Sequence, residues 1–139
     1  MTTTDTITSH AVPDDARVNH VAKLFGTHFP MSLEPYVFGI TNQLSPDYKG
    51  GLWEFLVLSN GGFYMAPHGS NRYRIVCENG FEGELSADAL GITACLYAYS
   101  HLSFGEDESF AATCAEHYHW LRAFMMDHAE ARMILRAID

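Results

Sequence analysis

A chain of 139 residues has the size of one domain, and 47% hydrophobic with 18% charged residues excludes a disordered protein. The net charge of −9 reflects a shortage of bases, since 17 acids are an ordinary number for this length and 8 bases are few. Eight dispersed bases form a poor surface for a nucleic-acid backbone, and the acids are too few to imitate DNA, which carries one charge per about 1.7 Å of duplex.

The N-terminal part of the chain predicts a polar tail followed by a helix. Residues 1–12 are expected to be a mobile tail, with neither the basic nor the apolar region of a signal peptide. Pro13, Asp14 and Asp15 are typical of a helix start, because acids stabilise the positive end of the helix dipole. Apolar residues from Val18 to Phe25 share one helical face, and Gly26 is a suitable stop. We expect one domain over residues 13–139, located in the cytoplasm.

The middle of the chain predicts an antiparallel β-meander of about four to five strands. Turn-forming residues separate short aromatic and aliphatic runs, and Asn60-Gly61-Gly62 supplies residues that tolerate positive φ. The expected strands are 36–40, 52–58, 63–67, 72–77 and 81–85.

The C-terminal part predicts about three helices. Ser86 is the expected N-cap of the first, with Leu85 and Leu90 placed as a hydrophobic staple. This helix runs to about Phe104, is apolar nearly all round and is expected to lie at the centre of the core. Two further helices are expected, at about 107–125 and 129–138. The fold class is therefore α+β, with an N-terminal helix and a C-terminal helical group packed on the strands.

The side-chain spacings do not indicate catalysis, a metal or a cofactor. His117 and His119 lie two residues apart on a helix and point in different directions, so they cannot share an ion. Cys77, Cys95 and Cys114 lie in apolar surroundings with no neighbouring base, which favours buried thiols. The paired glycines lack the lysine and helix start of a phosphate loop. We therefore expect no enzyme, no metal and no cofactor.

A long motif at residues 48–67 resembles a known family. The stretch Tyr48-Lys49-Gly50-Gly51-Leu52-Trp53-Glu54-Phe55, followed by Leu58-Ser59-Asn60-Gly61-Gly62-Phe63-Tyr64-Met65-Ala66-Pro67, is similar to the signature of the ArdB/KlcA family of small antirestriction proteins. Residues 24–26, 81–92 and 134–139 agree with it as well, so the resemblance covers about residues 12–139.

The resemblance implies a function and a partner. It implies a protein of plasmids, phages or genomic islands that inhibits type I restriction-modification enzymes without catalysis and largely spares modification. The implied partner is the type I enzyme complex, either alone or together with its DNA, and the subunit is left open. The implied fold is an antiparallel sheet with helices packed on it. The family is distinct from the strongly acidic DNA mimics, and neither membrane association nor strong independent DNA binding is expected.

No catalytic residues carry over from the resemblance, so the candidate partner contacts come from position in the chain. Tyr64, His68 and Asp88 are expected to be exposed, because a short strand ends at Pro67 and loops carry binding residues. The full candidate set is Tyr48, Asn60, Tyr64, His68, Asp88, Arg132, Arg136 and Asp139. Two alternatives remain open: a small enzyme with a metabolite or nucleotide pocket lined by Trp53, Tyr64 and His68, and a weak DNA-binding module. A deep cleft would favour the first and a basic stripe the second.

Overall fold

The computed structural model describes residues 6–139 as helices packed with two antiparallel sheets, which confirms the α+β class. The helical elements are η1 (Asp14–Ala16), α1 (Arg17–Phe25), η2 (Phe29–Leu33, a π-helical turn), α2 (Glu34–Leu44), α3 (Ala87–Leu102), α4 (Glu108–Met125) and α5 (Ala131–Ile138). The strands are β1 (Ser9–Ala11), β2 (Trp53–Leu58), β3 (Phe63–Pro67), β4 (Arg72–Val76) and β5 (Glu82–Ser86). Within this described part of the chain, no helix is both long enough and apolar enough to cross a membrane.

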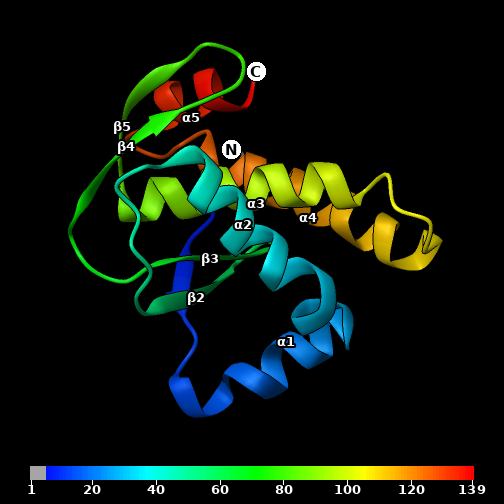
Figure 1. The fold of residues 1–139 in the computed structure, drawn as a ribbon. Helices are drawn as coiled ribbons and strands as arrows, with labels where there is room; N and C mark the ends of the chain where they lie inside the picture. The colour runs from blue at the N-terminus through cyan, green and yellow to red at the C-terminus, as the bar shows by residue number, and fades with distance from the viewer. Residues whose placement is uncertain (1–5) are drawn as a thin grey trace, which may run out of the picture.

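Helix α3 is the centre of the core, as its sequence predicts. The hydroxyl of Ser86 caps the helix by accepting the N–H of Ala89 at 3.1 Å. Nearly every residue from Ala87 to Tyr99 is buried, so the helix makes contacts on all sides. Figure 1 shows α3 running through the middle of the molecule, with β2, β3 and α1 on one side and β4, β5 and α5 on the other.

Helix α3 approaches strand β3 unusually closely at Gly91. A Cβ atom at this position would lie 2.3 Å from the Cβ of Ala66 and 2.4 Å from the carbonyl oxygen of Met65. Both neighbours are fixed by the strand backbone, so neither can rotate away. Only glycine allows the helix to lie at this distance from the strand.

The strands form two sheets rather than one continuous meander. The larger sheet has the order β1-β2-β3 and the smaller one pairs β4 with β5, all antiparallel. Side chains of α3 occupy the outer edge of β3. The N–H of Met65 is 3.5 Å from the Sγ of Cys95, and the hydroxyl of Tyr99 donates to the carbonyl of Phe63 at 2.7 Å. Strand β4 therefore cannot continue the first sheet at this edge.

The edge of β4 is likewise occupied by side chains. Ser45 donates its hydroxyl to the carbonyl of Arg74 at 2.7 Å, and the carboxylate of Asp47 accepts the N–H of the same residue at 2.9 Å. These two residues belong to the turn that follows α2. The turn therefore satisfies backbone groups that would otherwise be open at a sheet edge.

The expectation of a mobile tail over residues 1–12 is wrong for its second half, while residues 1–5 lie outside the described part of the chain. Residues 9–11 form β1 and pair with β2, with His10 opposite Val57. Val12 is buried and donates its N–H to the carbonyl of Phe55 at 2.7 Å. The polar composition conceals this strand because it is an edge strand whose side chains stay largely exposed.

The strand predicted at residues 36–40 is also wrong, because this segment belongs to α2. Pro35 lies in the first turn of the helix, a position that proline favours. The buried positions are Val37, Thr41 and Leu44, a spacing that fits one helical face. Aromatic and β-branched residues suggested a strand locally, and the longer helical period prevails.

Candidate functional site

A hydrogen-bonded group of polar side chains lies where β3, α3 and the loop before α5 meet. The hydroxyl of Tyr64 donates to one oxygen of Asp88 at 2.6 Å, and the Nε2 of His128 lies 2.9 Å from the other. The N–H of Glu130 donates to the Nδ1 of His128 at 2.9 Å. Because Nδ1 accepts this bond, the ring proton of the neutral imidazole lies on Nε2 and is donated to Asp88. These four residues are called the Asp88 cluster below.

The Asp88 cluster is tied to the start of α3 through the carboxylate of Glu130. Its two oxygens accept the N–H of Ser86 at 2.9 Å and the hydroxyl of Ser86 at 2.5 Å. Arg72 lies 3.6 Å from the same carboxylate and donates to Glu84 at 2.7 Å. The cluster therefore joins the N-terminus of α3 to the N-terminus of α5 and to the β4–β5 sheet.

The electrostatics of the cluster keep Asp88 ionised. Burial would raise the pKa of Asp88, but the hydrogen bonds from His128 and Tyr64 outweigh it and lower the pKa. The hydrogen bond to Asp88 raises the pKa of His128, while burial and the bond to Asp88 raise that of Tyr64. His128 and Glu130 were not predicted, because they lie about 40 residues from Asp88 in sequence and no spacing signal connects them.

Two of the predicted residues, Tyr64 and Asp88, are thus brought together, but one has the wrong environment. Tyr64 was expected to be exposed, whereas only 1% of its surface is accessible. Both faces of β3 are covered: α3 and α4 contact Ala66 and Tyr64 on one face, and Phe25 and Phe29 contact Phe63 on the other. The expectation for His68 is correct: its side chain is 64% exposed, and its Nδ1 lies 3.6 Å from a carboxylate oxygen of Glu54.

The other predicted residues divide between internal hydrogen bonds and the surface. The hydroxyl of Tyr48 accepts the indole N–H of Trp53 at 2.8 Å, and the amide of Asn60 donates to the carbonyl of Trp120 at 3.0 Å. These two side chains therefore have structural partners. Three residues of the C-terminal segment are exposed: Arg132, Arg136 and Asp139. The structure does not bring the predicted set together at one place.

The enzyme pocket considered as an alternative does not form. Tyr64 and Trp53 are buried, so they cannot line a pocket with the exposed His68. Burial raises the pKa of the Cys95 and Cys114 thiols to about 12, which makes them poor nucleophiles. Over residues 6–139, no three His, Cys, Asp or Glu side chains are grouped closely enough to hold a metal ion.

His117 is the most unusual polar group of the core. It is 2% exposed and lies among the rings of Phe25, Tyr99 and Trp120, with ring centroids 4.8 to 5.4 Å away. In the described part of the chain its Nδ1 has no hydrogen-bond partner. Burial lowers the pKa of His117 to about 4, so it stays neutral at physiological pH.

We expect His117 to make the protein sensitive to acid. An unfolded histidine has a pKa of about 6.5, so the unfolded state takes up the proton first and stability falls as the pH drops from there through about 4. When the pH is lowered from 7 to 4, the free energy of unfolding should fall in both proteins. The fall should be about 2–3 kcal/mol smaller for His117→Leu than for the parent. Urea denaturation at several pH values measures this. His119→Leu, one of the exposed histidines, is the control; equal profiles for the parent and His117→Leu would contradict the assignment.

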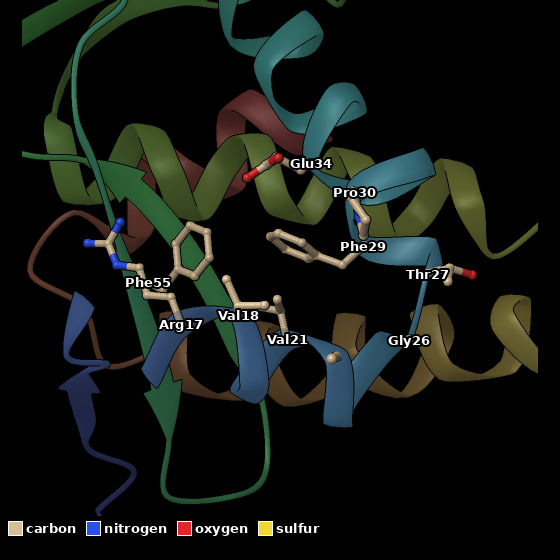
Figure 2. A pocket seen from close by; sticks show the side chains of 10 residues that line it. Arg17, Val18, Val21, Gly26, Thr27, Phe29, Pro30, Glu34 and Phe55 are labelled. Atoms are coloured by element: carbon tan, nitrogen blue, oxygen red, sulfur yellow. The ribbon is translucent and has the colours of Figure 1, made fainter. Parts of the chain in front are cut away.

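An apolar groove lies between α1 and η2 (Figure 2). Helix α1 and helix α5 lie on opposite sides of α3 (Figure 1). Its volume is about 550 Å³, within the range of small-ligand and side-chain pockets. Figure 2 shows Val18 and Val21 projecting from α1 toward Phe29 and Phe55, with Arg17 and Glu34 at the margin. Ala22, Gly26, Thr27 and Pro30 complete the lining. This groove is named the α1 groove.

Comparisons with known proteins give one consistent result. A family model described as antirestriction protein matches residues 46–139. The antirestriction protein KlcA of Escherichia coli is 44% identical over 137 residues, covering 96% of this chain and 94% of the relative. The uncharacterized protein YafX of Escherichia coli K12 is 41% identical over 138 residues, covering 96% and 88%.

A solved structure is also similar to this chain over its whole length. It aligns with a TM-score of 0.89 and 39% identity, covering 100% of this chain and 99% of the other. That structure belongs to work on the KlcA and ArdB proteins, which show a novel fold and antirestriction activity against type I DNA restriction systems in vivo but not in vitro.

Proposed function

The chain belongs to the antirestriction protein family, and from this premise we propose that it relieves restriction by type I restriction-modification systems as an inhibitor. The observation that carries the proposal is the match to the KlcA and ArdB structure over the full length of both chains. A match of this extent includes the surface loops and the C-terminal helix as well as the core. The whole molecule, not one module of it, therefore corresponds to a protein with activity in vivo.

The mechanism we propose is binding to the restriction enzyme complex without catalysis. The thiols are buried with raised pKa values, and the polar Asp88 cluster is occupied by its own hydrogen bonds. These features support an inhibitor that acts by contact. Of the predicted residues, His68, Arg132, Arg136 and Asp139 are exposed, and Asp88 is partly exposed. They stay predictions for partner contact.

Imitation of DNA is disfavoured by the charge content. A mimic needs a dense array of acids, whereas the negative charge here comes from few bases. An inhibitor that does not occupy the DNA-binding groove leaves DNA recognition and methylation available. We therefore propose that restriction is inhibited in the cleaving or translocating state of the complex, while modification is largely spared.

The DNA-binding alternative has little support from the arrangement of bases. Arg72 is paired with Glu84 and lies near Glu130, and Arg17 is paired with Asp14 at 3.1 Å. Paired bases offer little positive potential to a phosphate backbone. Within residues 6–139, the eight bases are distributed over α1, the segment before β2, β4, α4 and α5.

The test is restriction of phage in living cells, because the related proteins act in vivo but not in vitro. Unmodified phage should plate much more efficiently on a type I host that expresses the protein. A host without the type I system is the control and should show no change. Methylation of the recovered phage DNA should persist. Unchanged plating with abundant folded protein would contradict the function, and equal loss of methylation would contradict the mechanism.

A further inference from the structure

The α1 groove is an apolar surface that the chain leaves uncovered. Val18 lies at its mouth and is 78% exposed, although the sequence places it on the same helical face as the buried Val21 and Phe25. In the described part of the chain no segment packs over it. A helix face that is half core and half exposed apolar surface is typical of a binding groove.

The charges at the margin of the groove indicate what kind of segment would fill it. Burial raises the pKa of Glu34, and within residues 6–139 its carboxylate forms no ion pair. A partly desolvated carboxylate without a counter-ion is stabilised when a cation approaches it. Of the described residues that line the groove, Glu34 is the one acid.

At the other margin, the guanidinium of Arg17 is held over the ring of Phe55, 4.8 Å from its centroid, and pairs with Asp14. The positive charge of Arg17 is thus already neutralised by Asp14, whereas the negative charge of Glu34 has no such partner among the described residues. The complement of this groove is an apolar surface that carries a lysine or arginine at one end.

We propose that the α1 groove binds an amphipathic helix of the type I restriction complex, with apolar residues three and four apart in the groove and a basic residue beside Glu34. The inference rests on the proposed function and names the surface that performs it. An enzyme that handles DNA presents basic side chains, and this chain has 17 acids against 8 bases. An amphipathic helix presents apolar residues three and four positions apart on one face, and such a face fills an apolar groove.

The first experiment compares two charged substitutions of valine. Val18→Lys places a cation at the mouth of the groove and can pair with Asp14 one turn away, so the fold should be kept. Val76→Lys is the control: Val76 is an exposed position of β4, at 45%, and β4 lies across α3 from α1 (Figure 1). We expect Val18→Lys to reduce restriction relief at least tenfold with an unchanged melting temperature, and Val76→Lys to leave it unchanged. Full relief by a folded Val18→Lys variant would overturn the proposal while leaving the function intact.

The second experiment identifies the occupant directly and also decides the case in which Val18→Lys fails to fold. A photo-crosslinking phenylalanine derivative at position 18 is expressed in type I host cells whose restriction subunits carry tags. We expect a crosslink to a restriction subunit, within a segment that has apolar residues at helical spacing and a lysine or arginine. A crosslink to DNA, to a second copy of this chain or to no restriction subunit would overturn the proposal. If the parent protein gives no relief at all, the proposed function fails first.

Discussion

Replacing Gly91 with alanine is expected to destabilise the protein by at least about 3 kcal/mol, at the upper end of the cost of overpacking a core. The added Cβ would lie 2.3 Å from the Cβ of Ala66 and 2.4 Å from the carbonyl oxygen of Met65. Because neither atom can move without the strand, α3 would have to shift away from β3. The shift would also lengthen the bonds from Cys95 and Tyr99 to the edge of β3. Thermal and urea denaturation measure the loss.

The control for this prediction is the same substitution in another helix. Gly39 is an exposed residue of α2, and a Cβ there would have no neighbour within 4 Å. Gly39→Ala should therefore stabilise the protein by about 0.5–1 kcal/mol, since alanine is the better helix former. Opposite signs for the two variants separate close packing from helix propensity. A Gly91→Ala variant as stable as the parent would show that α3 and β3 do not approach as described.

The second large effect is expected for Tyr64→Ala, which should lower the free energy of unfolding by about 3–5 kcal/mol. Removing a buried aromatic ring leaves a cavity that the surrounding core fills only in part. The ring is fully enclosed and stacks with that of Phe124, with centroids 5.8 Å apart. Asp88 would also lose the donor at 2.6 Å. Restriction relief should fall because less folded protein is present, and a melting curve recorded on the same variant shows this.

Tyr64→Phe distinguishes the ring from its hydroxyl. It keeps the packing and removes one hydrogen bond to a carboxylate, which should cost about 1.5–3 kcal/mol at most because Asp88 still accepts from His128. We expect this variant to fold and to retain restriction relief in cells. Loss of relief by a variant that melts near the parent temperature would instead show that the buried hydroxyl positions Asp88 for function.

The elements that could be predicted from the sequence are those with local signals at both ends. Ser86 gives α3 a cap, and Asn60-Gly61-Gly62 gives the β2–β3 hairpin its turn, with Gly61 at a φ of 104°. Strand β1 and helix α2 were missed for opposite reasons. β1 is polar because it is a short edge strand, and α2 contains β-forming residues whose period of burial is helical.

The polar cluster could be predicted only in part. Tyr64 and Asp88 were named separately, but nothing in the sequence shows that they form a hydrogen bond or that His128 is their partner. Such a cluster depends on how α3, β3 and the loop before α5 pack, which is a tertiary property. The α1 groove was missed for a related reason: Val18 fits an apolar helix face, and only packing decides how far the core extends along it.

The side chains that occupy the strand edges have a consequence for how the protein can be recognised. Cys95 and Tyr99 cover the backbone of β3, and Ser45 and Asp47 cover that of β4. A partner therefore cannot add a strand of its own at either edge, and recognition there depends on side chains and helices. The same closure removes two templates for aggregation. High concentrations of the protein are therefore compatible with these two edges, which cannot pair into β-rich aggregates.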